Sequence, residues 1–336
     1  MAFVAGDFTS SQLSAAILKA DNMWADSMLK ADYTANVEVV TALRAEQTAD
    51  VSILENKDKD RNVKIHWLAT CGNEVEDDDD DTCTIGGDEA GVDSKEYALT
   101  IKKKYGFSIK EDTFRTNEYN MEDVVARCFL DADKALSEAI AVSAVGRIDS
   151  FKGVNQAAAG IGTVVGHETE VHSADWTSRL FAYLTKVSKL NKFSNPFLLS
   201  GDNLFEERLV TMLSEANANG KGDKMLFSLL RTYFDLFNVD TVLSPLQKTF
   251  MINRGAIAFA SKAKYTAVPV KYKEQDRWSI ESRNLPGVRY DVYYTNKCTE
   301  DDMQHDFTVR AWYDFYNNPT GCTATNTGVL SFKRVL

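Results

Sequence analysis

The chain has 336 residues and a mass of 37.5 kDa; 44% of its residues are hydrophobic and 11% are aromatic. This apolar content supports a sizeable buried core, so the composition excludes wholesale disorder. No apolar run approaches the roughly 18 residues needed to cross a bilayer, and the first residues, MAFVAGDFTSSQ, lack the basic and apolar regions of a secretory signal. We therefore expect a protein that is assembled in a cytosol and does not enter a membrane.

The N-terminal region is predicted to be one amphipathic helix followed by a connection. Within residues 7–31, apolar side chains recur at helical spacing, at Leu13, Ile17, Ala20, Trp24 and Met28. Residues 32–60 are mixed in composition and include the charge-rich run ENKDKDR. We expect this second segment to be exposed.

Two extended runs frame a long polar stretch. They are residues 63–71 (VKIHWLATC) and residues 96–109 (EYALTIKKKYGFSI). Two β-forming runs around a polar tip are typical of an extended hairpin. A connection of more than about 15 residues without structure is unusual inside a compact domain. We therefore predict that this hairpin projects from the body as an arm.

The acidity of the chain is concentrated at the tip of this arm. The formal net charge is −11, from 38 Lys and Arg and 49 Asp and Glu. Ten of the acids lie within residues 74–93, which contain no Lys or Arg, and removing them leaves 39 acids against 38 bases. Such a nearly neutral body does not predict tight binding to duplex DNA, because that binding needs clustered Lys and Arg.

Residues 121–148 are predicted to form a long helix. Asn120 is a suitable N-cap, and Glu122 and Asp123 are acids where the helix dipole favours them. Apolar residues then repeat at spacings of three or four, at Val125, Phe129, Ala132, Leu136, Ile140, Ala144 and Ile148. At 1.5 Å per residue the helix is roughly 40 Å long, which exceeds the usual length. We expect it to be a strut along which other elements pack.

The remaining segments predict an α+β fold with strands that are distant in sequence. Residues 153–172 are Gly- and Ala-rich and are expected to form a loop or a domain crossing. Helices are predicted at residues 176–190 and 202–217, and a short buried strand at residues 197–200. Residues 225–237 are ambiguous between helix and strand. Extended segments are expected at 256–265, 268–273, 289–298, 305–317 and 329–335.

Two motifs resemble ligand sites but have the wrong spacing. Gly160–Gly166 reads GxGxxxG, one residue longer than a dinucleotide fingerprint, and it follows a helix rather than a strand. His167 and His172 stand at i and i+5, about 140° apart on a helix, whereas a zinc helix places its ligands at i and i+4. We interpret the first motif as a loop and assign no metal to the second. No GxSxG, P-loop or papain-type signature occurs, so the sequence predicts no catalytic residue and no cofactor.

The acidic run offers weak candidates for a metal site. Asp77, Asp79 and Asp81 fit positions one, three and five of a calcium loop. Thr82 then occupies the position that needs Gly, and Asp88 the position of the bidentate Glu. A solvated acidic tip is the preferred interpretation, with adventitious cation binding as the alternative.

The five cysteines do not form a disulfide scaffold, because their number is odd, their density is low and no CxxC pair occurs. Cys71 ends the first extended run and Cys83 lies in the acidic tip. A crosslink between them is left open, although a cytosolic location disfavours it.

The order of these elements carries a family resemblance. A helical N-terminal arm, a long hairpin and a strut helix precede a helix–strand–helix unit (WTSRLFAYLTKV, then NPFLLSGDNLFEERL) and β segments that end in TGVLSFKRV. Across most of the chain this order resembles the major capsid protein of tailed double-stranded DNA bacteriophages. Residues 248–265 (KTFMINRGAIAFASKAKY) and 313–332 (YDFYNNPTGCTATNTGVLSF) are similar to capsid proteins of crAss-like phages and their relatives, which infect Bacteroidetes.

The resemblance implies a domain organisation and an assembly function. The domains would be an N-terminal arm (1–48), the family's extended E-loop (49–113), a P-domain with its spine helix (114–169), an A-domain (170–265) and a β-rich return (266–336). Copies would form pentamers and hexamers of an icosahedral shell that encloses double-stranded DNA without sequence-specific binding. The virion would assemble in the host bacterial cytoplasm, with portal, scaffolding or decoration proteins as further partners.

Two further expectations follow from the resemblance. A long hairpin is not stable alone in water, so a neighbouring copy would supply its packing face. Some family members carry a long N-terminal scaffolding segment, whereas the first predicted helix here begins within about ten residues of Met1; scaffolding would then be a separate protein or lie upstream of this chain.

Three alternatives stay open, one with the same fold and two from other classes. An encapsulin-like nanocompartment would share the fold and enclose cargo enzymes. A calcium-dependent binding module would use the acidic loop 74–93. An unrecognised α/β enzyme is the third, and the failed motifs count against it. The acidic tip and the C-terminal stretches favour the phage interpretation.

Overall fold

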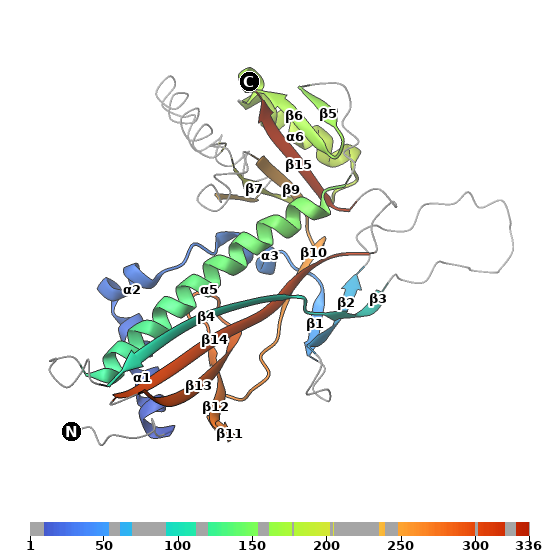
Figure 1. Cartoon of the computed structure of the whole chain (residues 1–336). Coiled ribbons are helices and arrows are strands. Elements are labelled where there is room, and N and C mark those ends of the chain that lie inside the picture. Colours follow the sequence, from blue (N-terminus) through green and yellow to red (C-terminus); the bar gives the residue numbers. More distant parts are fainter. Residues whose placement is uncertain are drawn as a thin grey trace, which may run out of the picture.

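A computed structural model describes residues 10–53, 61–68, 92–111, 120–153, 161–176, 178–201, 204, 235–238, 248–299, 302–319 and 327–335. Within these ranges the fold is α+β, as predicted, with two six-stranded sheets, a three-stranded sheet and one long helix that runs from one large sheet to the other (Figure 1). We call the large sheet that contains β14 the body sheet and the one that contains β15 the distal sheet.

The body sheet is built from segments that lie far apart in the chain. Its strands are β4 (Ile101–Lys110), β10 (Ile257–Ser261), β11 (Val270–Tyr272), β12 (Gln275–Glu281), β13 (Arg289–Thr299) and β14 (Asp302–Asn317). The order is β10-β14-β13-β12-β11, and β4 also pairs with β14. Tyr313–Asn317 of β14 pair with β10 and Gln304–Tyr313 pair with β4, so two strands share one edge of β14 in succession.

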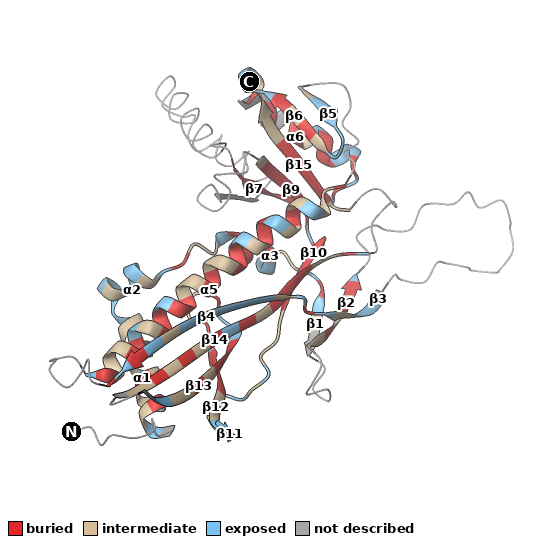
Figure 2. Ribbon diagram, viewed as in Figure 1, coloured by how far each residue is buried: buried red, intermediate tan, exposed pale blue. Residues whose placement is uncertain are grey.

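The long helix α5 (Met121–Phe151) packs along one face of the body sheet, and the strut prediction is confirmed. Asn120 caps it, since its side chain accepts a hydrogen bond from the amide of Glu122 at 3.4 Å. All seven predicted apolar positions are buried, as the stripe on α5 in Figure 2 illustrates. The Phe129 ring lies edge-on to Phe107 of β4 and Phe307 of β14, with centroids 5.6 and 5.7 Å away.

The N-terminal segment consists of three helices, so the prediction of one helix is wrong. They are α1 (Ser10–Ala25), α2 (Ser27–Tyr33) and α3 (Glu38–Ala45). The break falls at Asp26, whose side chain caps α2 by accepting from the amide of Met28 at 3.0 Å. Met28 is 84% exposed, whereas Leu13 and Ala20 are buried.

The expectation of an exposed connection at residues 32–60 is also wrong for part of that range. Helix α3 buries Val39, Val40, Ala42 and Leu43, and β1 (Asp50–Ile53) follows it. The composition of residues 32–60 is dominated by the charge-rich run ENKDKDR, residues 55–61, and this concealed the apolar residues of α3. All of that run except Arg61 lies outside the described residues.

The distal sheet has the order β5-β6-β15-β9-β7-β8. Its strands are β5 (Gly162–Val165), β6 (Glu168–His172), β7 (Pro196–Ser200), β8 (Asp235–Asn238), β9 (Lys248–Asn253) and β15 (Val329–Val335), with α6 (Ser178–Leu190) and a short 3-10 turn, η1 (Ser173–Asp175). Leu198, Met251 and Leu330 share a core with α6, while Phe197, Phe250 and Ile252 belong to the core that contains α5. The central strands are therefore buried on both faces.

Most of the other predicted elements are confirmed. The helix at 176–190 and the strands at 197–200, 256–265, 268–273, 289–298, 305–317 and 329–335 correspond to α6, β7, β10, β11, β13, β14 and β15. The loop predicted at 153–172 is wrong, because its second half is the antiparallel pair β5–β6. Nearly all of the helix predicted at 202–217 lies outside the described residues, as does the ambiguous segment 225–237 up to β8.

The arm begins as a three-stranded sheet rather than a two-stranded hairpin. β2 (Asn62–Leu68) pairs with β3 (Val92–Ala98) on one side and with β1 on the other. The prediction of one strand over 96–109 is wrong, because the chain turns at Leu99–Thr100 and continues as β4 in the body sheet. We call β1, β2 and β3 the arm base.

Candidate functional site: the corner where the arm leaves the body

The arm base is seated on its own subunit. Val63, Ile65 and Trp67 of β2 are fully buried in a cluster that also contains Ala258 and Ala260 of β10. The alternation of buried and half-buried residues along β2 is that of a strand with one face on a core. The expectation that another copy supplies this packing face is therefore wrong for the described part of the hairpin.

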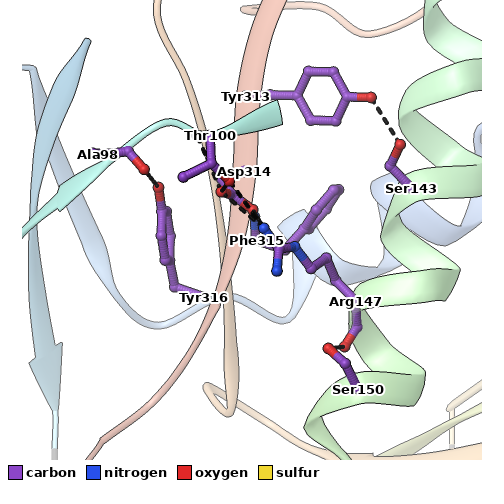
Figure 3. A network of polar contacts seen from close by, with 9 residues as sticks. All are labelled: Ala98, Thr100, Ser143, Arg147, Ser150, Tyr313, Asp314, Phe315 and Tyr316. Atoms are coloured by element: carbon purple, nitrogen blue, oxygen red, sulfur yellow. Dashed lines mark hydrogen bonds and ion pairs between the residues drawn. The ribbon is translucent and has the colours of Figure 1, made fainter. Parts of the chain in front are cut away.

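Asp314 of β14 holds the corner between the arm and the body. Its side chain is almost fully buried and accepts from the amide and the hydroxyl of Thr100 at 3.2 and 2.5 Å (Figure 3). Arg147 of α5 reaches the same carboxylate, with Nη2 3.0 Å from Oδ1, and also donates to the Thr100 hydroxyl at 3.0 Å. Three elements, the β3–β4 turn, β14 and the strut, therefore meet at one carboxylate.

Two tyrosines on β14 extend this network to either side. Tyr316 donates its hydroxyl to the carbonyl of Ala98 at 3.0 Å, and the hydroxyl of Tyr313 lies 2.9 Å from that of Ser143 on α5. Burial raises the pKa of Tyr316, and the nearby charge of Asp314 raises it further. The phenol therefore stays protonated and remains a hydrogen-bond donor to the arm over the physiological pH range.

The arm has two legs, the residues that lead into β2 and those that follow β3. A second buried aspartate holds the leg that leads into β2. Arg61 precedes β2 and donates to Asp291 of β13 at 2.6 Å and to the carbonyl of Lys262 at 2.9 Å. Asp291 is fully buried and also accepts from the amides of Lys264 and Tyr265, at 2.7 and 3.3 Å. Charged hydrogen bonds of this kind are about twice as strong as neutral ones. Both legs of the arm are thus fixed to the body sheet.

Side-chain contacts further along the arm base continue the attachment. Trp67 donates its indole N–H to the Tyr97 hydroxyl at 3.2 Å, and the Tyr97 ring lies 4.4 Å from that of Tyr316, centroid to centroid. Asn318 donates to the carbonyl of Leu68 at 3.0 Å. The direction in which β2 and β3 leave the body is therefore determined within one subunit.

The strut is fixed to the body sheet by a third buried aspartate. Asp133 of α5 accepts from the hydroxyl of Ser282 at 2.5 Å and from the amides of Arg283 and Asn284 at 2.9 and 3.2 Å. Asn284 also accepts from the amide of Ala35 at 2.7 Å. These bonds satisfy a charge that burial alone would make costly, and they join α5, the β12–β13 turn and the N-terminal helices.

Alternating charges connect the end of the strut to the distal sheet. Lys248 of β9 lies 2.9 Å from Asp149 and 2.5 Å from Glu168, and Lys152 lies 2.6 Å from Glu168 and 3.3 Å from Asp149. Burial opposes ionisation of Glu168, but hydrogen bonds from Lys152 and Lys248 outweigh it and lower the pKa of that carboxyl. The same contacts raise the pKa of Lys248 against the opposing effect of burial.

The residues singled out in the sequence do not assemble into a metal or catalytic centre within the described ranges. Asp77, Asp79 and Asp81, with Cys71 and Cys83, lie outside those ranges. His167 lies in the turn between β5 and β6, and His172 ends β6, so the two are not on a helix. The described part of the chain holds no group of three or more His, Cys, Asp or Glu side chains that could bind a metal ion.

The functional residues that sequence reasoning missed are the three buried aspartates Asp133, Asp291 and Asp314. Each is an acid inside an apolar periodic run, for example Asp314 in HDFTVRAWYDFYN and Asp133 in the strut. Lys, Glu, Arg and Asp are almost never fully buried without a partner. An acid within such a run therefore predicts a buried carboxylate that is hydrogen-bonded to a neighbouring element.

Comparisons with known proteins give structural likenesses but no sequence match. No family model matches the sequence, and no curated protein matches it. The structure is similar to a chain of the cyanophage A-1(L) capsid asymmetric unit, at 11% identity over 82% of this chain and 88% of that chain, with a TM-score of 0.49. It is also similar to chains from Mycobacterium phage Adephagia (11% identity, 90% and 91% covered, TM-score 0.45) and the capsid of Ralstonia phage GP4 (10%, 81% and 83%, 0.42). Among the described helices, none is long and apolar enough to span a membrane.

Proposed function

We propose that this chain is a structural subunit of an icosahedral phage capsid. The observation that carries the proposal is the arm base, a separate small sheet whose two legs are fixed by Asp314 and Asp291 at one edge of a body that is braced by a 31-residue helix. The inner face of the arm base is packed on its own body, and this fixed seat suits the arm to lead toward a contact with another molecule. The sequence resemblance to tailed-phage major capsid proteins supports the same assignment.

We assign the domains of the proposed subunit by sheet. The body sheet with α5 is the P-domain, the distal sheet with α6 is the A-domain, and β1, β2 and β3 begin the E-loop. The chain enters the distal sheet at β5, returns to the body sheet at β10 and enters the distal sheet again at β15. A shell subunit divided in this way can place its A-domain at the centre of a pentamer or hexamer while its arm reaches the next copy.

The proposal extends to the life cycle of the particle. The subunits assemble in the cytoplasm of the host bacterium and remain in the virion around double-stranded DNA, without sequence-specific contacts. The near balance of 39 acids and 38 bases outside the acidic segment suits a wall that encloses DNA and does not bind it tightly. The proposed role is structural, without enzymatic activity.

The size of the particles formed by the purified chain tests this function. Electron microscopy and analytical ultracentrifugation should show capsomers or closed shells. The test is made at a subunit concentration of about 10 µM, which exceeds the dissociation constants of ordinary specific complexes. A chain that remains a 37.5 kDa monomer under these conditions would contradict the proposal. A large rise in melting temperature with calcium in such a monomer would favour the calcium-dependent binding module instead.

A further inference from the structure

The last part of α5 is held from two nearly opposite sides. Arg147 and Asp149 are two residues apart, so their side chains leave the helix about 200° apart at 3.6 residues per turn. Arg147 reaches Asp314 and Thr100 at the corner of the arm (Figure 3). Asp149 reaches Lys248 of the distal sheet at 2.9 Å. The same short stretch of helix is therefore attached both to the arm and to the distal sheet.

The contacts on the first side form what we call the corner clamp, which consists of Thr100, Arg147 and Asp314. Nη2 of Arg147 lies 3.0 Å from the Asp314 carboxylate and 3.0 Å from the Thr100 hydroxyl. One turn earlier, the hydroxyl of Ser143 lies 2.9 Å from that of Tyr313. Because Ser143 and Arg147 stand at i and i+4, they share one face of the helix. That face is bound to two consecutive residues of β14.

The contacts on the second side form the distal clamp. Glu168 of β6 lies 2.6 Å from Lys152 and 2.5 Å from Lys248 of β9. The amide of Gly153 donates to the carbonyl of Val329 of β15 at 2.9 Å, so the backbone that leaves α5 is also bound to the distal sheet. We call Asp149, Lys152, Glu168 and Lys248 the distal clamp.

The two clamps fix the rotation of α5 about its axis more sharply than apolar packing does. Phe250 and Ile252 of β9 share a core with Ile148 of α5, but the hydrophobic effect has no preferred direction. The clamps consist of hydrogen bonds and ion pairs, which weaken steeply when distance or angle changes. A small rotation of this part of the helix would therefore disturb both clamps together.

We propose that residues 143–153 of α5 couple the distal sheet to the arm, so that loosening the distal clamp loosens the corner clamp. Such a coupling acts equally in both directions, and ordering of the arm would tighten the distal clamp. The coupling belongs to the folded subunit and does not require a shell. With the proposed shell function, it means that a neighbour that displaces the distal sheet changes the direction of the arm.

A second connection between the distal sheet and the arm base runs through Asn318. Its side chain donates to the carbonyl of Leu68 at 3.0 Å and to that of Gly255, between β9 and β10, at 3.3 Å. A change at Lys248 on β9 can reach the arm along this path as well. Glu168 lies on β6, two strands from β9, and is the better place to perturb the distal clamp.

Amide hydrogen exchange of the full chain tests the coupling, with unassembled subunits isolated by size-exclusion chromatography. The amide of Thr100 is the reporter, because it donates to Asp314 at 3.2 Å. Glu168→Gln removes the charge and keeps the size of the side chain. It should accelerate exchange at Thr100 and in β2 and β3 about threefold or more, while β12, two strands from β14, keeps its rate. Lys152→Gln, which removes the opposite charge of the same pair, should do the same.

Glu170→Gln is the matched control for Glu168→Gln. Glu170 is half-buried like Glu168 and lies two residues further along β6, so both side chains point to the same face of the strand. Within the described ranges, Glu170 forms no ion pair with Lys152 or Lys248. The control should change exchange at Thr100 by less than about 1.5-fold.

Detaching α5 from the corner supplies the decisive comparison. Arg147→Met with Ser143→Ala removes the side-chain bonds that α5 makes to Thr100 and to β14. It leaves the bonds between Thr100 and Asp314, so the reporter amide stays measurable. In this double variant, Glu168→Gln should add less than about 1.5-fold to exchange at Thr100, because the coupled contact is already absent.

Three results would overturn the proposal: an unchanged Thr100 amide in Glu168→Gln, equal acceleration by Glu170→Gln, or an effect of Glu168→Gln that persists in the double variant. The last result would assign the connection to the path through Asn318. Electron microscopy of the wild-type chain, carried out separately, decides the shell function, so failure of the coupling and failure of the proposed function remain distinguishable.

Discussion

Replacing Asp314 with Asn tests whether the corner clamp holds the arm. The substitution keeps the shape of the side chain and removes its charge. It turns one acceptor oxygen into a donor that faces the amide and hydroxyl of Thr100 and the guanidinium of Arg147, all of them donors to the carboxylate. Breaking a buried ion pair costs about 3–5 kcal/mol. The Arg147 side chain is 37% exposed and can be solvated, so we expect the lower end, about 3 kcal/mol.

The assay has a global and a local readout. With an unfolding entropy of about 2.1 cal/mol/K per residue, a chain of 336 residues loses about 4 °C of melting temperature for 3 kcal/mol. Hydrogen exchange should accelerate in residues 62–68 and 92–98, because the corner that orders them has lost a partner. Circular dichroism and mass spectrometry measure the two effects.

A matched substitution on the same strand makes the result interpretable. Asp306→Asn removes a carboxylate whose ion-pair partner, Lys297, is 65% exposed and whose other donors, Ser108 and Gln304, are neutral. Exposed ion pairs contribute about 1 kcal/mol or less. The reasoning fails if Asp314→Asn destabilises no more than Asp306→Asn, or if exchange in β2 and β3 is unchanged by it.

Three further changes probe the strut, the link to the distal sheet and the arm. Leu136→Asp puts an unpaired charge on the buried face of α5 and should abolish folding; soluble mutant protein that assembles normally would contradict the placement of the strut. Folding lowers the pKa of Glu168. The ionised carboxylate therefore contributes fully to stability above the unfolded-state pKa of about 4.3, and this contribution is lost as the pH falls through the lower pKa of the folded state. The difference in urea unfolding free energy between wild type and Glu168→Gln should therefore be constant from pH 7 to about 5 and shrink in more acidic buffer; a difference that grows there would refute the assignment. Deleting residues 76–83 should leave the circular dichroism and melting of the subunit intact and impair assembly seen by electron microscopy, and an unfolded deletion variant would show that the segment belongs to the core.

The sequence predicts elements well where one rule operates over a long stretch. The strut is such a case, because a cap at Asn120 and an apolar repeat over residues 125–148 agree. The strands of the body sheet follow in the same way from alternation in runs such as RYDVYYTNKC. The capsid resemblance drew on the order of these elements and on the stretches 248–265 and 313–332.

The sequence fails where composition and local structure disagree. Helix α3 has only eight residues, too few for its four buried residues to register as a periodic face in a segment of mixed composition. Residues 96–109 satisfy strand alternation throughout, and only the tertiary contact of Thr100 with Asp314 shows that the chain changes sheets at that point. The corner is thus a long-range feature, formed by residues 214 positions apart, and no local pattern encodes it.

The seating of the arm base on its own body changes what assembly has to supply. A free hairpin would have to be ordered when the shell forms, and ordering costs about 1–2 kcal/mol per residue in backbone entropy alone. Here β1, β2 and β3 are already packed on β10 and held by Asp314 and Asp291, so that cost is met when the subunit folds. Contact energy between copies can then be concentrated at the surfaces that meet. A weakened corner should consequently slow shell formation even where those surfaces are intact, because the arm would no longer be presented in one direction.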